Sequence, residues 1–158
     1  MTKQILTATV LVLFFTGCSL LGLRKPPVQE IKGDNVVCFL FKTGTFKSDV
    51  VKNVTQFLTG KDLTVVTDTV KNARYYNASD YGAVIYMAEY WAWHTPRHAK
   101  RYFNKNKGYQ NIIFVITSGD PDVTIKKPFD AVTSASKPDR VETVSQEIIE
   151  RLGFILRF

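Results

Sequence analysis

Short continuous apolar runs, rich in β-branched and aromatic residues, alternate along this chain with segments of helical periodicity. Such runs are typical of strands that are buried on both faces. Strands that alternate with helices form a parallel sheet covered on both sides. The sequence therefore predicts one α/β domain over 34–158, a three-layer sandwich with a five-stranded parallel sheet. Its expected strands are 36–41, 63–67, 83–88, 112–116 and, more weakly, 129–133.

Three helices are expected between these strands, because each candidate segment has recognisable start and stop residues. The helices are predicted from Ser48 to Gly60, from Thr95-Pro96 to about Asn106, and from Asp139 to Gly153. The polar stretch 68–80 is irregular, with room for a helical turn at 69–73. The apolar tail 154–158 is expected to form a short strand or to pack against the core.

The N-terminus has the parts of a secretory signal peptide: Lys3, a short apolar core over 5–15, and small residues before Cys18. The core is too short to span a bilayer, which needs about 20 apolar residues. The placement of Cys18 after Thr16-Gly17 resembles the lipobox of bacterial lipoproteins. That resemblance implies a signal peptide over 1–17 and a lipid on Cys18. A simple secretory peptide with an incidental cysteine stays open as the alternative.

Residues 18–33 are predicted to be a flexible tether, since the paired prolines at 26 and 27 disfavour a helix. A lipid on Cys18 would hold the domain at a lipid membrane, in the bacterial cell envelope on its periplasmic or outer-surface side. If Cys18 is acylated, Cys38 has no disulfide partner. It lies in an apolar run, so it is expected to be a small buried side chain.

The chain has a formal charge of +7, part of which belongs to the signal peptide and tether. Attraction to anionic lipid or envelope polymer is therefore expected, and no nucleic-acid partner. Zinc-ligand spacing, a nucleophile elbow and a Walker loop are missing from the sequence. The corresponding classes of hydrolase, NTPase and zinc protein are not indicated.

Ligands of an open parallel sheet bind at the carboxyl ends of its strands. The loop after the first strand offers hydroxyls, a lysine and a helix N-terminus, which favour a phosphate. The loop after the third strand offers aromatic rings that can stack on a flat heterocycle. The loop after the fourth strand is a small polar turn. The predicted cofactor-binding residues are Thr43, Gly44, Thr45, Phe46, Lys47, Ser48, Tyr90, Trp91, Trp93, Ser118 and Gly119.

Together these loops resemble those of the flavodoxin-like family, over about 35–153. The family's first loop, Ser/Thr-x-Thr-Gly-x-Ser/Thr, holds the phosphate of FMN, and Thr43, Thr45 and Ser48 match its hydroxyl positions. Phe46 stands where the family has glycine. The segment 80–103 is similar to the family's third strand, flavin-stacking loop and following helix. Too few residues follow the fourth strand for the usual helix, so the resemblance is to a shortened member.

Two functions remain open from the sequence. The first is a membrane-tethered FMN-binding protein for electron transfer or reduction, in which Trp91 and Trp93 cover the flavin. The second is a cofactor-free flavodoxin-like module that docks an envelope protein through the same aromatic loop. Other polar residues have plainer interpretations. We interpret His94 as a neighbour of the helix cap, the basic side of 97–107 as a solvated face, and Asp120 and Asp122 as turn-formers.

Overall fold

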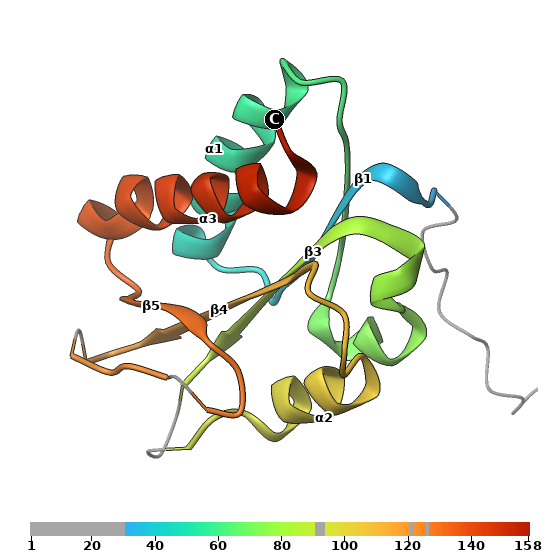
Figure 1. The fold of residues 1–158 in the computed structure, drawn as a ribbon. Helices are drawn as coiled ribbons and strands as arrows, with labels where there is room; N and C mark the ends of the chain where they lie inside the picture. The colour runs from blue at the N-terminus through green and yellow to red at the C-terminus, as the bar shows by residue number, and fades with distance from the viewer. Residues whose placement is uncertain (1–30, 91–93, 121, 126) are drawn as a thin grey trace, which may run out of the picture.

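Five strands form one parallel sheet in the order β2-β1-β3-β4-β5 (Figure 1). This computed structural model describes residues 31–90, 94–120, 122–125 and 127–158. The strands are β1 (Gly33–Leu40), β2 (Thr64–Asp68), β3 (Tyr81–Glu89), β4 (Ile112–Ser118) and β5 (Ala131–Ala135). Every neighbouring pair is parallel. The predicted five-stranded α/β architecture is confirmed.

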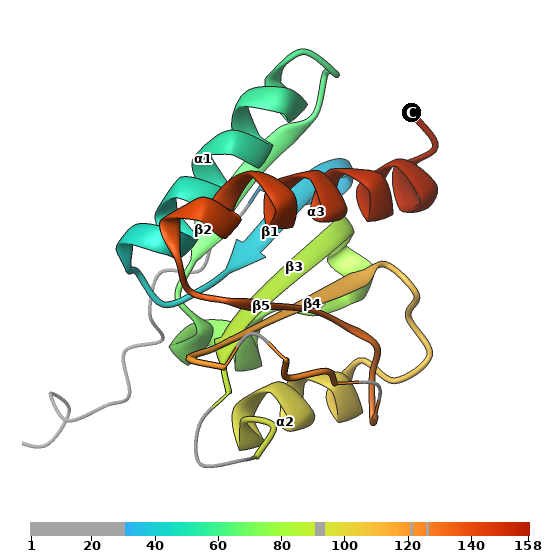
Figure 2. The same ribbon diagram turned by 90° about the vertical axis from the view of Figure 1, so that its left-hand side faces the viewer.

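One face of the sheet is covered by two long helices that lie side by side, α1 (Thr45–Thr59) and α3 (Val141–Leu156) (Figure 2). Their apolar stripes meet the side chains of the central strands, as expected for amphipathic helices on a sheet. The cluster includes Val50, Leu58, Ile148, Leu152, Phe39, Ile85 and Val115. We call this the helical face.

The opposite face is covered by α2 (Arg97–Lys105) and by two short 3₁₀ segments, η1 (Val70–Tyr75) and η2 (Ala78–Asp80). Its core is aromatic. Tyr86 of β3 stacks on Tyr102 of α2 with ring centroids 4.9 Å apart, and Phe114 of β4 stacks on Phe129 at 3.8 Å. Cys38 is buried in this cluster, as predicted. We call this the aromatic face, and it completes the three-layer arrangement.

The predicted start of the first helix is wrong by one turn. Helix α1 begins at Thr45, with Gly44 before it, and Ser48 lies inside the helix as an exposed residue. Both Thr45 and Ser48 carry hydroxyls, so residue type alone did not separate a cap from a first-turn residue. The predicted end is correct, since Gly60 follows the last helical residue.

The last helix is longer than predicted. Helix α3 continues through Gly153 to Leu156, and Arg157 adopts the left-handed conformation (φ 59°) that ends it, with its N–H bonded to the Gly153 carbonyl at 2.9 Å. Ile155 and Leu156 are half-buried against the helical face, so the tail packs on the core as helix. The burial of these side chains outweighs the low helix propensity of one glycine.

Three other predicted boundaries shift by one or two residues. Pro96, not Thr95, immediately precedes α2. A 3₁₀ turn at Pro138–Arg140 precedes α3, so Asp139 does not cap it. Strand β5 covers 131–135 rather than 129–133, because Phe129 leaves the sheet to stack on Phe114. No helix in the described part of the chain is both long and apolar enough to cross a membrane.

Candidate functional site

The strand order places a switch point between β1 and β3. From β1 the chain passes to β2 on one side, and it then returns to β3 on the other side. Connections that leave in opposite directions open a crevice at the carboxyl ends of the two strands, and ligands of such folds bind there. Those ends are Leu40 and Glu89. The loop 41–44 and the first turn of α1 border this crevice.

The N-terminus of α1 is open to solvent. Its residue Thr45 follows Gly44, whose backbone is extended, and no described side chain makes a capping hydrogen bond there. The first turn holds no acidic residue. Thr43, Gly44 and Thr45 are all exposed, and a Cβ at position 44 would meet nothing within 4 Å. Free amides and an uncompensated helix dipole make this end suitable for an anion.

Phe46 does not project into this open end. Its side chain is 9% exposed and belongs to the apolar cluster of the helical face, together with Val37 and Val50. Only its backbone is available at the helix end. Phe46 stands where the flavodoxin-like family has glycine, but its side chain does not block the N-terminus of α1.

Lys47 is not a free cation. Its side chain is buried, and its Nζ lies 2.6 Å from Oε1 of Glu89, the last residue of β3. The hydrogen bond from Lys47 lowers the pKa of the Glu89 carboxyl. Partial burial opposes this shift, and the charges of Lys47, Lys42 and His98 lower the pKa further. Sequence reasoning missed Glu89. Its position at the predicted end of the third strand was the available signal.

A pocket of about 240 Å³ lies at this ion pair. His98 in the first turn of α2 reaches its wall, and the ring Nδ1 lies 2.8 Å from the Tyr86 hydroxyl. Burial lowers the pKa of His98 although Glu89 opposes the shift, so the neutral imidazole is favoured. Sequence reasoning also missed this histidine. The pocket is lined by Lys42, Lys47, Val70, Met87, Ala88, Glu89 and His98.

The two other predicted loops are only partly described. Tyr90 is half-buried and its N–H donates to the Thr117 carbonyl at 2.7 Å, which ties the loop to β4. Trp91 and Trp93 lie outside the described residues, so ring stacking stays a prediction. Gly119 is exposed after β4.

Ser118, by contrast, is nearly buried and serves its own turn. Its hydroxyl donates to the Asp120 carbonyl and accepts from the Asp120 N–H. The Asp120 carboxylate accepts from the Asp122 N–H at 2.9 Å, consistent with turn-forming roles. No group of metal-ligating side chains occurs among the residues that the structure describes.

The strand order, the two covered faces and the crevice between β1 and β3 are those of a flavodoxin-like α/β fold. Among solved structures, the chain is similar to the rubredoxin oxygen:oxidoreductase of Desulfovibrio gigas, at 16% identity and a TM-score of 0.48. The match covers 79% of this chain and 37% of that one, so this chain spans little more than a third of its length. No family model and no curated protein matches the chain.

Proposed function

We propose that this flavodoxin-like domain binds FMN at the carboxyl ends of β1, β3 and β4 and serves electron transfer or reduction in the bacterial cell envelope. The observation that carries the proposal is the open N-terminus of α1 beside the switch point. Exposed Thr43, Gly44 and Thr45 precede or begin a helix that has no side-chain cap. A helix end of this kind favours a phosphate.

The backbone N–H groups of Thr45, Phe46 and Lys47 would hold the phosphate, with the hydroxyls of Thr43 and Thr45 beside them. The loops at Tyr90, Trp91, Trp93, Ser118 and Gly119 would border the ring system. When bound, FMN supplies one- and two-electron redox chemistry, while the protein binds and orients it. Lys47 and Glu89 together would form one wall of the crevice, because their charges already compensate each other.

FMN titration of a soluble domain beginning near Lys25 tests the proposal. We expect quenching of FMN fluorescence at micromolar concentration. Gly44→Asp places a carboxylate at the helix end, where it caps the amides and repels phosphate, so affinity should fall at least about tenfold. Gly60→Asp makes the same charge change at the other end of α1 and is the control. A colourless wild-type domain that does not quench FMN would contradict the proposal.

Stacking by the aromatic loop has a separate test. Trp91→Ala or Trp93→Ala should weaken FMN binding by about 1–3 kcal/mol, on the scale of base–aromatic stacking. If both variants bind as tightly as wild type, a different loop covers the ring.

The alternative is a cofactor-free module that docks an envelope protein through the aromatic loop. The Lys47–Glu89 ion pair favours it, because this pair occupies the crevice between β1 and β3 with groups that satisfy each other. A pull-down from envelope extract, with and without Trp91 and Trp93, distinguishes the two functions when combined with the FMN titration. A partner captured only by the wild type, without FMN binding, supports docking.

The anchoring part of the proposal depends on Cys18, which would carry the lipid and become the first residue once residues 1–17 are removed. Metabolic labelling with an alkyne fatty acid should label the wild type and not Cys18→Ser. Label on both proteins, or on neither, would contradict a lipid at this residue.

A further inference from the structure

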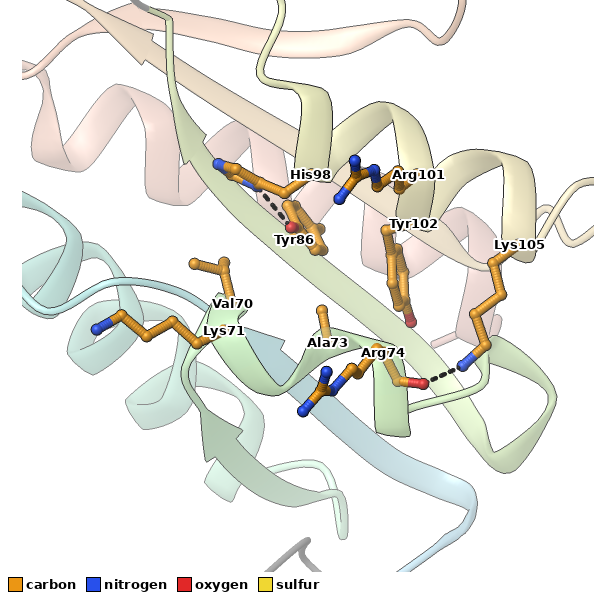
Figure 3. Close-up of a pocket in the computed structure, with 9 residues that line it drawn as sticks. All are labelled: Val70, Lys71, Ala73, Arg74, Tyr86, His98, Arg101, Tyr102 and Lys105. Atoms are coloured by element: carbon orange, nitrogen blue, oxygen red, sulfur yellow. Dashed lines mark hydrogen bonds between the residues drawn. The ribbon is translucent and has the colours of Figure 1, made fainter. Parts of the chain in front are cut away.

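A second pocket, of about 310 Å³, lies on the aromatic face between η1 and α2 (Figure 3). It adjoins the pocket at the switch point, since Val70 and His98 line both. Its volume is at the lower end of the range for small-molecule sites. Neither the proposed flavin site nor the aromatic loop includes its remaining residues.

One side of the pocket is formed by η1, which with η2 connects β2 to β3 without an α-helix. Asp68 at the end of β2 holds η1 in place, since its carboxylate accepts from the Thr69 N–H (2.6 Å), Asn72 Nδ2 (3.0 Å) and the Tyr76 hydroxyl (2.6 Å). Lys105 of α2 then reaches across and donates to the carbonyls of Arg74 (2.7 Å) and Tyr76 (3.1 Å). Hydrogen bonds to Asp68 and from Lys105 therefore hold η1, one wall of the pocket, in position.

The charges around this pocket are of one sign. Arg74 from η1 and Arg101 from α2 approach it from opposite sides (Figure 3), and Lys71 and Lys105 stand at its edges. No carboxylate lines it. Within the described residues, none of these four cations forms a salt bridge, although Asp80 acts on Lys105 at longer range. Lys32, Lys47 and Arg151, by contrast, are each paired with a carboxylate.

The floor of the pocket is apolar and aromatic. Val70, Ala73, Tyr86 and Tyr102 provide it, and Tyr86 is fixed through the contact of its hydroxyl with His98. Arg74 is held against the Tyr75 ring, with the guanidinium carbon 4.6 Å from the ring centroid. Two arginines beside an apolar floor match a ligand with an anionic phosphoryl head and an apolar body, because guanidinium binds phosphate through paired hydrogen bonds.

We propose that this pocket binds a phosphate monoester or diester, with its phosphoryl group between Arg74 and Arg101 and its organic group on Tyr86 and Tyr102. The ester is either a soluble small molecule or the headgroup of an anionic phospholipid. The site is separate from the helix end at Thr45, and it does not depend on FMN binding.

Two binding experiments on the full chain test the proposal and separate the sources. The chain carries Cys18→Ser in both, so that no attached lipid contributes. The first experiment titrates phenyl phosphate by calorimetry, with inorganic phosphate for comparison. The second measures flotation with phosphatidylcholine vesicles, with and without 30% phosphatidylglycerol. Arg101→Gln removes a pocket charge, and Arg97→Gln removes an exposed arginine of the same helix that does not line the pocket.

Arg101→Gln should weaken binding about tenfold, as expected for loss of one charge-assisted contact, while Arg97→Gln changes it less than twofold. Gly44→Asp, which closes the α1 end, should leave this binding unchanged. Binding of phenyl phosphate indicates a soluble ester, and binding only to phosphatidylglycerol vesicles indicates a headgroup. No binding to either probe overturns the proposal. Equal losses in Arg101→Gln and Arg97→Gln, or a loss in Gly44→Asp, also overturn it.

Discussion

The two faces of the sheet are covered in different ways. On the helical face, the long helices α1 and α3 place mainly apolar side chains over the strands, and the only buried polar residues described in these two helices are Lys47 and Ser145. On the aromatic face, the covering elements are shorter: the nine-residue α2 and the 3₁₀ segments pack over tyrosines and phenylalanines. Both described pockets include residues of η1 and α2.

The difference shows how one sheet can separate stability from binding. Aliphatic residues between a sheet and two helices interdigitate to the density of a crystal, which leaves little room for a ligand. Short 3₁₀ segments cannot cover a strand as a full helix does, and tyrosine hydroxyls need polar partners. We therefore expect the helical face to provide most of the stability, while the aromatic face contributes to both described pockets.

The largest effect is expected from Ile148→Ala on the helical face. Ile148 is fully buried in α3, and removing its branches leaves a cavity, so the free energy of unfolding should fall by about 2–5 kcal/mol. Urea unfolding measures this change. Phe154→Ala on the same helix is the control, because its side chain is 87% exposed and should change stability by less than about 0.5 kcal/mol. Similar losses in both variants would contradict the described packing of α3.

The next effect is expected from Asp68→Ala on the aromatic face. It withdraws the acceptor that orders η1, and the loss of hydrogen bonds to a charged group should cost about 2 kcal/mol. Amide hydrogen exchange should accelerate in η1 and remain unchanged in α1 and α3. Asp49→Ala, an exposed carboxylate in α1, is the control. Uniform acceleration across the domain would show that the two faces open together.

A smaller effect is expected from Glu89→Gln, at the junction of the two faces. The change removes the charge that compensates buried Lys47, so stability at neutral pH should fall by about 1 kcal/mol. Folding lowers the pKa of Glu89 below its ordinary value of 4.5, so its contribution is complete above that pH. The contribution is lost as pH falls through the lower folded-state pKa.

Unfolding measured between pH 6 and pH 3 should therefore show a smaller acid-induced loss in Glu89→Gln than in wild type. Parallel pH profiles for the two proteins would exclude a linkage through this carboxyl. Glu142→Gln, on an exposed site at the start of α3, controls for the general loss of an acidic group.

The smallest signal is expected from Cys38, beneath the aromatic face. It is fully buried, and burial raises its thiol pKa to about 12, so little reactive thiolate is present at pH 8. In a Cys18→Ser chain, whose remaining thiol is Cys38, a thiol reagent should modify the protein only after unfolding in urea. Rapid labelling of the native protein would mean that the aromatic face opens down to β1.

The sequence predicted the fold because buried parallel strands need continuous apolar runs. The predicted strands 36–41, 83–88 and 112–116 overlap β1, β3 and β4 for this reason. Helix ends were less predictable, since several residues offer the same capping chemistry. Gly153 was predicted to end the last helix, but α3 continues to Leu156 because the residues after Gly153 pack against the core.

Within the candidate site, the sequence located the loop 43–48 before a helix, although the helix begins one turn earlier, at Thr45, and it could not identify the partner of Lys47. That lysine and Glu89 are 42 positions apart. The need for glycine at position 82 was likewise not predictable from the sequence. A Cβ there would lie 1.9 Å from the Asp34 carbonyl oxygen, a close approach created only by the pairing of β1 and β3.

By itself, the sequence determined the alternation of strands and helices, because hydrophobic periodicity is a local property of the chain. It thereby also determined that the polar loops would meet at the carboxyl ends of the strands. The tertiary structure alone decided which charges are neutralised and which are not. It paired Lys47 with Glu89 and left Arg74 and Arg101 facing one pocket from two elements. Charge interactions depend on distance in space, which the spacing of residues along the chain does not specify.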